Sequence, residues 1–344
     1  MLVNAGLAAG PGPWAPPPRL AARLRNRLGR TRRRFTTAAL REPSFSYKEL
    51  EAQRERRLMR ELGCKDPAFE VDAKDDMHAW AVRLGLPTPR LLASYDDVRF
   101  LDWGSLPDRF VLKPTRGTVS AGVYLLVRDG DGWRDLLSRR VLGESDIAQE
   151  IAELLKAETV SASFLVEELV EDPRLPGEQP VDYKVWTFFG RVGLIEAKFH
   201  GIDRQGRPAA TWRNFDTSWT DLGNLFNEDY DDSIPAPLHG PELLDVARRV
   251  SAAIPRPFLR VDLLDSADGP VLGEITPEPG GDNSLPPRLD RLFGRYWEDA
   301  EARLKVRAAR SGIMSPTDEP QSEAWVGQED GLRVRHERRR RRRG

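Results

Sequence analysis

The chain has 344 residues, of which 40% are hydrophobic and 31% are charged, and its formal net charge is −1. This composition supports a sizeable core divided over two or three lobes, and it excludes a fibrous or wholly disordered protein. The single cysteine, Cys64, excludes an internal disulfide and fits a reducing compartment. Because the sequence has no apolar run as long as a membrane span and no signal-peptide core, we expect a soluble protein of the cytoplasm.

Both ends of the chain are basic and poor in apolar residues. Residues 1–34 combine proline with arginine, and residues 338–343 are an unbroken run of arginine. Such segments have little to bury, so disorder is predicted for residues 1–34 and 310–344. The basic ends could contact nucleic acid or an anionic membrane surface, or they could be solvated tails. We expect no specific nucleic acid partner.

Residues 35–105 are predicted to form an N-terminal lobe of helices and one strand. Residues 47–62 are charged and carry apolar side chains at helical intervals. A second helix is predicted for residues 72–84, with Asp72 as its N-cap, and a strand for residues 90–95.

A loop of small residues separates two short strands at residues 110–127. The strands read FVLKP and VYLLV, and the loop between them reads TRGTVSAG. Backbone N–H groups and hydroxyls of such a loop can bind phosphate oxygens, and Lys113 at the strand end adds a positive charge. The spacing is not that of a Walker loop, so an ordinary hairpin loop beside a lysine is the alternative.

The next segments carry further candidates for nucleotide contacts. A helix is predicted for residues 146–158 and a strand for residues 163–170, where two acids either accept hydrogen bonds from ribose hydroxyls or face water. A hairpin is predicted for residues 182–199, turned by Gly190-Arg191, and its lysines are either phosphate ligands or charges on an edge strand. The two acids are Glu167 and Glu168, and the two lysines are Lys184 and Lys198.

Residues 200–222 are predicted to be a loop of polar and aromatic side chains. Its Trp and Arg residues either line a substrate cleft or fix the loop to the core. Helices are predicted for residues 241–253 and 289–309.

A second hairpin, at residues 258–275, is interrupted by two acids. Because side chains on a strand alternate between faces, Arg260 and Asp262 share one face. If the loop has an odd number of residues, Asp262 lies opposite Glu274, with about 5 Å between the β-carbons, where like charges repel. A Mg²⁺ ion would remove this repulsion, since it prefers carboxylate ligands. A two-residue turn at 268–269 would separate the acids, and charges on an exposed face are the other alternative.

Strands and helices do not alternate as they do in βαβ units. We therefore expect an α+β fold with lobes around a cleft. The four histidines are too scattered for a zinc cluster, and no G-x-S-x-G or Cys-His nucleophile pattern is present.

Taken in order, these segments resemble the ATP-grasp superfamily and, more narrowly, the TupA-like ATP-grasp group associated with teichuronopeptide and polysaccharide biosynthesis. The resemblance covers roughly residues 70–300. It implies an ATP-grasp fold in which a nucleotide is held in a cleft between two α+β lobes, a central lobe at residues 106–185 and a C-terminal lobe at residues 186–309. The segments that carry it are DAKDDMHAWAVRLGLPTP, RFVLKPTRGT, VDYKVWTFFGRVG, GIDR, FDTSW and FLRVDLLDSADGPVLGEITPEPGG.

The resemblance also implies ATP and Mg²⁺ as cofactors and gives roles to individual residues. Nucleotide contacts are expected from Lys113, Thr115, Gly117, Thr118, Ser120, Glu167, Glu168, Leu169 and Lys184. Mg²⁺ ligands are expected at Asp262, Glu274 and Thr276, catalytic contacts at Arg260 and Lys198, and substrate contacts at Asp203 and Arg204. Thr276 stands where many ATP-grasp enzymes have Asn, so the third metal ligand is open between Thr276, Asp282 and Asn283.

The activity implied by the resemblance is that of an ATP-dependent carboxylate–amine ligase that forms an acyl phosphate. It would attach an amino acid or peptide to a polysaccharide or uronic-acid-type substrate, so its partners would be small-molecule or glycan carboxylates and amines. One alternative is a kinase of a sugar or other small molecule, with Asp203 or His200 as base. Another is a non-catalytic nucleotide-binding module, which would not need Lys113, Asp262 and Glu274 together.

Overall fold

The computed structural model describes residues 42–64, 66, 73–117, 120–202, 208–226, 228–280 and 285–311. The chain divides into two compact units, Met1–Pro43 and Ser44–Gly344. Every helix and strand named below belongs to the second unit. The predicted disorder of residues 1–34 and of almost all of residues 310–344 lies outside the described residues.

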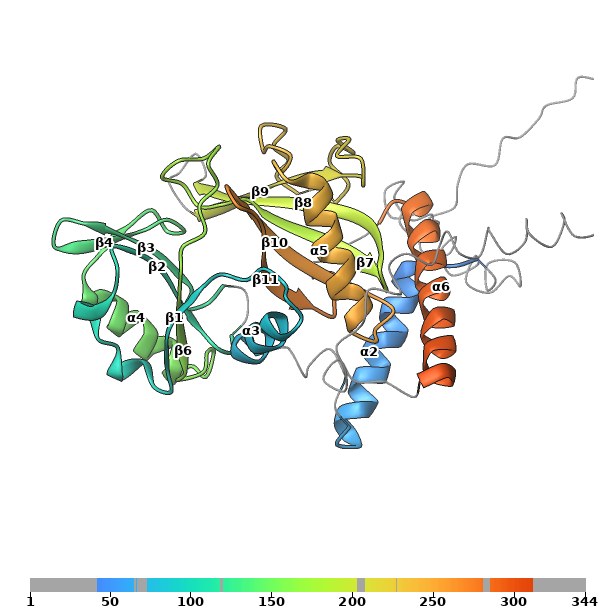
Figure 1. Cartoon of the computed structure of the whole chain (residues 1–344), viewed down its shortest axis with the longest axis horizontal. Helices are drawn as coiled ribbons and strands as arrows, with labels where there is room; N and C mark the ends of the chain where they lie inside the picture. Colours follow the sequence, from blue (N-terminus) through green and yellow to red (C-terminus); the bar gives the residue numbers. More distant parts are fainter. Residues whose placement is uncertain are drawn as a thin grey trace, which may run out of the picture. The chain divides into compact units, whose positions relative to one another are not determined.

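A six-stranded antiparallel sheet is formed by residues between 91 and 167. Its strands are β1 (Leu91–Tyr95), β2 (Arg109–Pro114), β3 (Tyr124–Asp129), β4 (Gly132–Asp135), β5 (Val141–Leu142) and β6 (Phe164–Glu167), with the short helices η3 (Val98–Phe100) and η4 (Trp103–Ser105) after β1. They lie in the order β1-β6-β2-β3-β4-β5. Helix α4 (Glu144–Lys156) packs against this sheet, with Ile147 and Ile151 in one apolar core with Phe110, Leu112 and Trp133 (Figure 1). The predicted phosphate loop connects β2 to β3.

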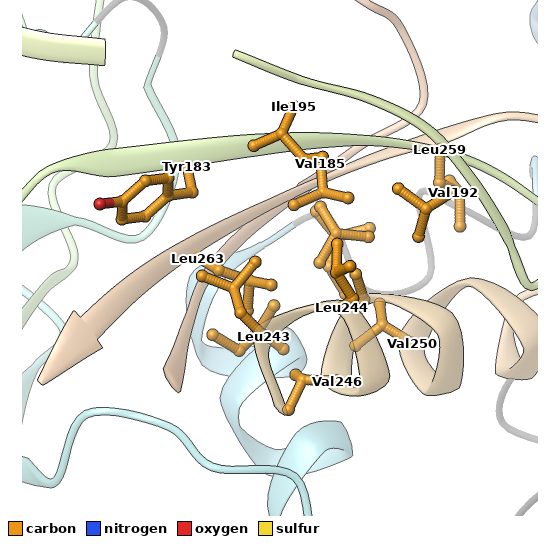
Figure 2. Packing of buried hydrophobic residues seen from close by; sticks show 14 of the residues in the cluster. Tyr183, Val185, Val192, Ile195, Leu243, Leu244, Val246, Val250, Leu259 and Leu263 are labelled. Carbon is orange, nitrogen blue, oxygen red and sulfur yellow. The ribbon is translucent and has the colours of Figure 1, made fainter. Parts of the chain in front are cut away.

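A five-stranded antiparallel sheet is formed by residues between 182 and 276. Its strands are β7 (Asp182–Phe188), β8 (Arg191–Ile202), β9 (Pro208–Phe215), β10 (Leu259–Ser266) and β11 (Gly269–Thr276). They lie in the order β11-β10-β7-β8-β9. Helix α5 (Gly240–Ala253) covers one face, where Leu243, Leu244 and Val250 pack with Val185 and Leu263 of the strands (Figure 2).

The opposite face of the five-stranded sheet has its own apolar core at one end. Helices α2 (Phe45–Glu61) and α6 (Pro287–Ser311) lie side by side there (Figure 1). Phe45 is fully buried, and its ring centroid lies 5.1 Å from that of Trp186 and 5.5 Å from that of Trp297. A further helix, α3 (Lys74–Arg83), adds Trp80 to the core under α5. Among the described helices, none has both the length and the apolar composition of a membrane span.

Most predicted elements are present, with ends shifted by a few residues. The helices predicted at 47–62, 72–84, 146–158, 241–253 and 289–309 are α2, α3, α4, α5 and α6. Asp72, the predicted N-cap of α3, lies outside the described residues, and Ala73 holds the N-cap position. Strands β4 and β5 were not predicted.

The prediction of a loop for residues 200–222 is wrong in part. Strand β8 continues to Ile202, and β9 pairs with it from Ile195↔Phe215 to Ile202↔Pro208. Because β9 is the last strand of the sheet, it pairs with only one of the described strands and does not need the apolar composition of a central strand. Pro208 stands at its first residue, a position where proline is tolerated.

The turn between β7 and β8 is shifted by one residue from the expected position. Phe188 pairs with Arg191, so the turn residues are Phe189 and Gly190. Both have positive φ, 45° and 87°. Type I′ hairpin turns need positive φ at both positions, which explains the glycine at the second.

The hairpin of β10 and β11 has an irregular ladder. Its turn has two residues, because Ser266 pairs with Gly269. Such a turn alone would leave Asp262 opposite Gly273. A β-bulge at Gly273 shifts the ladder by one residue, and Asp262 pairs with Glu274. Glycine leaves room at this place, since a β-carbon on it would lie 3.3 Å from the carbonyl oxygen of Asp262.

The predicted lobes and the two sheets divide the chain at different residues. Strand β1, from the predicted N-terminal lobe, pairs with β6 of the predicted central lobe. Strand β7 runs across the predicted boundary between residues 185 and 186. The division into lobes at these residues stays a prediction.

Candidate active site

A row of polar side chains crosses the five-stranded sheet on the face opposite to α5. From β11 to β9, the strand register aligns Glu274, Asp262, Lys184, Glu196 and Asn214. Directly paired residues on adjacent strands point to the same face, and adjacent strands are about 4.8 Å apart. The sheet therefore brings together five polar residues that are far apart in the sequence.

Asp262 is the best-connected residue of this row. Its Oδ2 lies 2.5 Å from Nζ of Lys184, and its Oδ1 lies 2.7 Å from Nε of Arg260. Only 2% of Asp262 is exposed. Burial alone would raise the pKa of Asp262, but the charges of Lys184 and Arg260 lower it, so the carboxylate is ionised.

Both cations are themselves held in place. Nζ of Lys184 also lies 2.6 Å from Oδ2 of Asp182. Burial acts to lower the pKa of Lys184, but the two carboxylates raise it. Arg260 donates to the carbonyl oxygen of Pro279 at 2.8 Å and to Oγ1 of Thr276 at 3.2 Å. The guanidinium is therefore fixed beside both predicted metal ligands of the hairpin.

Glu274 differs from Asp262 because its side chain is exposed to solvent. Partial desolvation by the surrounding chain, and then the charge of Asp262, raise the pKa of Glu274. The charge of Lys74, at the start of α3, lowers the pKa of Glu274. Glu274 thus carries an electrostatic penalty that a cation between the two carboxylates would remove.

The donors at this place fit Mg²⁺ with two protein carboxylates. Mg²⁺ is commonly bound by one or two carboxylates and by substrate phosphates, and Asp262 and Glu274 supply two hard oxygen donors side by side. In the part of the chain that the structure describes, no group of three or more His, Cys, Asp or Glu side chains could hold a metal ion. Thr276 uses its hydroxyl to accept from Arg260, and Asp282 and Asn283 lie outside the described residues.

Lys113 and Glu167 form a second buried ion pair, in the six-stranded sheet. Nζ of Lys113 lies 2.6 Å from Oε2 of Glu167, and the two residues are 7% and 3% exposed. The predicted phosphate ligand and the predicted ribose contact are therefore adjacent.

Thr115 is tied into the structure at the start of the predicted phosphate loop. Its hydroxyl shares hydrogen bonds with Oγ of Ser161 at 3.0 Å and Oγ of Ser163 at 2.5 Å. Its carbonyl oxygen accepts from the backbone N–H of Lys74 at 3.2 Å. Since Lys74 also acts on the pKa of Glu274, the start of α3 connects the loop with the second hairpin.

The other predicted nucleotide contacts surround this loop or the end of β6. Gly117 forms an isolated bridge with Val160, and a β-carbon on Gly117 would lie 3.2 Å from that side chain. Ser120 has a positive φ of 58°. Glu168 is exposed and lies 3.1 Å from Arg90, whereas Leu169 is buried. Thr118, Asp203 and Arg204 lie outside the described residues.

Lys198 lies on the same face as the row, two residues from Glu196. It pairs with Asp182, and its Nζ lies 5.2 Å from the ring centroid of Trp212. Burial lowers the pKa of Lys198. His200 is the next residue of β8 on this face. Burial, together with the charges of Lys198 and Lys184, lowers the pKa of His200 to about 4.

Several residues of the site were not predicted. Asp182, Glu196 and Lys74 contact or act on predicted site residues, and Asn214 pairs with Glu196. The alternation of β8 offered one signal, since Glu196 shares a face with Lys198. No comparable signal existed for Asn214, because its strand was not predicted.

Comparisons with known proteins give one family match and several distant structural matches. The family described as TupA-like ATPgrasp matches residues 74–298. A search of curated proteins gave no match.

Three solved structures illustrate the structural matches. D-alanine–D-alanine ligase from Bacillus anthracis complexed with ATP is 13% identical, with 74% of this chain and 75% of that chain covered and a TM-score of 0.43. The ATP-grasp ligase PsnB complexed with minimal precursor, Mg and ADP is 18% identical, with 83% and 74% covered and a TM-score of 0.37. D-cycloserine synthetase DcsG is 18% identical, with 66% and 68% covered and a TM-score of 0.36. Because these TM-scores are below 0.5, only the family match supports a conclusion about this chain.

The family match covers more than half of the chain and includes both sheets. It contains Lys113, Asp262 and Glu274. It confirms the expected α+β ATP-grasp fold class and the expected enzyme class, an ATP-grasp ligase. The chain belongs to the TupA-like ATP-grasp family.

Proposed function

We propose that the chain joins a carboxylate to an amine at the expense of ATP, through an acyl phosphate. The observation that carries this proposal is the alignment of Glu274, Asp262 and Lys184 on three adjacent strands, with Arg260 bound to Asp262. Two carboxylates beside two fixed cations suit a magnesium-bound polyphosphate. The nucleotide would lie in a cleft between the two lobes.

The reaction would have two steps. A carboxylate oxygen of the first substrate attacks the γ-phosphorus of ATP, the bond to the β-phosphate oxygen breaks, and ADP leaves. The nitrogen of the amine then attacks the carbonyl carbon of the acyl phosphate. The tetrahedral intermediate expels inorganic phosphate, the nitrogen loses a proton, and an amide remains.

In this scheme the protein contributes fixed charges and needs no nucleophile of its own. Lys113, Lys184 and Lys198 would bind phosphate oxygens, and Arg260 would stabilise the transferred phosphoryl group or the oxyanion. Asp262 and Glu274 would hold Mg²⁺, which neutralises phosphate charge when it is bound. The loop from Thr115 to Ser120 would lie over the phosphates, and Glu168 with Leu169 would lie near the adenine and ribose.

The substrates and the compartment belong to the proposal as well. We place the enzyme in the cytoplasm and expect an amino acid or peptide to be attached to a polysaccharide or uronic-acid-type carboxylate. The proposal of a glycan rests on the family assignment. Asp203 and Arg204 would lie near the acceptor.

A kinase that phosphorylates a hydroxyl is the other candidate for this site. It would need a base near the acceptor, and His200 lies on the correct face. The lowered pKa of His200, about 4, makes it a weak base, because an effective general base has a pKa near the working pH. This observation favours the ligase, and product analysis would separate the two reactions.

The first experiment is the thermal stabilisation of the protein by ATP with and without Mg²⁺. The wild type is compared with Glu274→Gln and with Asp268→Asn, a control in the exposed turn of the same hairpin. A ligand at about a hundred times its Kd adds about 2.7 kcal/mol of stability, which is readily seen as a rise in Tm. We expect the magnesium-dependent rise in the wild type and in Asp268→Asn, and its loss in Glu274→Gln.

Two outcomes would contradict the proposal. A full magnesium-dependent rise in Glu274→Gln would show that the metal assignment is wrong. If no nucleotide raises the Tm of the wild type, the chain does not bind nucleotide at this site and the proposed ligase function is wrong.

A further inference from the structure

Beyond Lys184, the polar row continues into a group of oxygen acceptors that the reaction steps above do not use. Glu196 and Asn214 are paired across β8 and β9 and are 3% and 2% exposed. Glu228 belongs to the segment that runs beside β9, where the backbone N–H of Trp212 donates to the carbonyl oxygen of Asp229 at 2.8 Å. Three acceptor side chains therefore lie at this end of the row.

Two of these acceptors are buried without a donor. Nδ2 of Asn214 donates to the carbonyl oxygen of Gly223 at 2.9 Å, which fixes the direction of the amide. Among the described residues, Oδ1 of Asn214 and Oε2 of Glu228 are buried and have no hydrogen-bond partner. An unpaired buried acceptor costs about 1–3 kcal/mol, so this place favours a molecule that donates hydrogen bonds.

The carboxyl of Glu196 has one donor, Nε1 of Trp186. Burial is the main reason why the pKa of Glu196 rises to about 8, and the charge of Glu228 adds to this effect. Burial also raises the pKa of Glu228, by more than the charge of Lys198 lowers it, so a further positive group would stabilise the charged form of both carboxyls. The Trp186 ring also stacks on Phe226, with centroids 5.8 Å apart, which gives the place an apolar wall.

We propose that Glu196, Asn214 and Glu228 bind the amine substrate through its ammonium group, which gives one proton to the carboxylate of Glu228 before the neutral nitrogen attacks the acyl phosphate. A primary ammonium has three N–H donors and no acceptor, and three oxygen acceptors match it. Glu196 on β8 lies directly opposite Lys184, on the side of Lys184 away from Asp262, and is two strands from Asp262. The amine would therefore lie about one strand spacing from the proposed phosphate-binding lysine, on the same face.

This assignment rests on the proposed ligase function, but it can be tested separately. The probe is methylammonium chloride, compared with tetramethylammonium chloride at the same ionic strength, because the second cation has no N–H donor. The Tm of the full chain is measured for the wild type, Glu228→Gln and the control Asp268→Asn. Glu228 is the residue to change because it is only partly buried, whereas Glu196 and Asn214 lie in the core.

At about ten times its Kd, methylammonium should raise the Tm of the wild type and of Asp268→Asn by about 2–4 °C more than tetramethylammonium. Glu228→Gln should lose most of this difference. Equal effects of the two salts on the wild type would overturn the proposal and leave water as the occupant. An undiminished difference in Glu228→Gln would overturn it as well.

ATP with Mg²⁺ in the same series separates the two proposals. A response to methylammonium without a response to nucleotide would contradict the ligase function and leave the ammonium site. A response to nucleotide without a response to methylammonium would contradict the ammonium site alone.

Discussion

Glu196 illustrates how the surroundings of one residue set its charge. Its carboxyl accepts a hydrogen bond from Trp186, and 3% of the residue is exposed. Burial raises its pKa to about 8, far from the ordinary value of a glutamic acid. Asp262 is equally buried, but its pKa is lowered, because Lys184 and Arg260 supply positive charge. Burial alone does not decide protonation, and the partner groups must be known.

The raised pKa of Glu196 predicts a pH-dependent loss of stability. Its pKa is 4.5 in the absence of a shift and about 8 in the folded protein. The contribution of this group to the free energy of unfolding is fully present below about pH 4.5 and is lost as the pH rises to about 8. In this range the unfolded chain releases the proton of Glu196, whereas the folded state keeps it. Glu196→Gln cannot ionise and keeps an oxygen acceptor for Trp186.

Relative to the wild type, Glu196→Gln should therefore gain stability between pH 5 and pH 8, by up to about 1.4 kcal/mol per pH unit. Urea unfolding at several pH values measures this difference. The control Asp268→Asn, in the exposed turn, should follow the wild type at each pH. A constant difference between Glu196→Gln and the wild type at all pH values would show that Glu196 ionises normally.

At the scale of single elements, the hairpin of β10 and β11 shows how one residue sets which side chains meet. The two-residue turn would leave Asp262 opposite Gly273, and the bulge at Gly273 moves Glu274 into that position. Strand side chains alternate, so a shift of one residue exchanges the two faces. The sequence predicted that Asp262 pairs with Glu274 if the loop of the hairpin has an odd number of residues. In the structure the turn has two residues, and the extra residue that brings the two acids together is Gly273 in the bulge.

Deletion of Gly273 should remove the bulge. The residues of β11 on the turn side of the deletion keep their register, so Glu274 would follow Leu272 directly and stay opposite Asp262 in a regular ladder. We expect a folded variant whose ATP-dependent rise in Tm still responds to Mg²⁺. Insertion of one alanine after Gly273 is the matched variant: it would put the alanine opposite Asp262, turn Glu274 to the other face and abolish the response to Mg²⁺.

Circular dichroism would show whether the two variants are folded. A normal magnesium response in the folded insertion variant would contradict the pairing of Asp262 with Glu274 as the basis of the metal site.

At the scale of the whole molecule, the helix α2 is part of the domain although it precedes the family match at residues 74–298. Phe45 packs on Trp186 of β7 and on Trp297 of α6. Arg56, which is buried, forms an ion pair with Glu278, in the segment that follows β11. The helix therefore supports the sheet from the face that also carries the polar row.

Phe45→Ala should lower the free energy of unfolding by about 3–5 kcal/mol, because it removes a fully buried aromatic ring from a cluster of aromatic rings. Tyr47→Ala, two residues away on the same helix, is the control. Tyr47 is 56% exposed, so its loss should change stability by less than about 0.5 kcal/mol. Urea unfolding measures both. Equal effects would show that α2 does not contribute to the core.

The sequence by itself determined the local pattern and the family. Alternation along the strand placed Arg260 with Asp262, the turn residues marked the hairpin, and the order of short motifs identified the ATP-grasp group. These inferences succeed because they depend on residues that are close in the chain.

Only the tertiary structure decided which distant residues meet. Asp262 lies beside Lys184, and Glu196 beside Asn214, because β10 pairs with β7 and β8 with β9. Which strands pair, and how deeply each side chain is buried, depend on the whole sheet. The alternation of polar and apolar residues along a single strand predicts neither of them. The site is therefore a property of the sheet, assembled from strands of which all except β9 were predicted one by one.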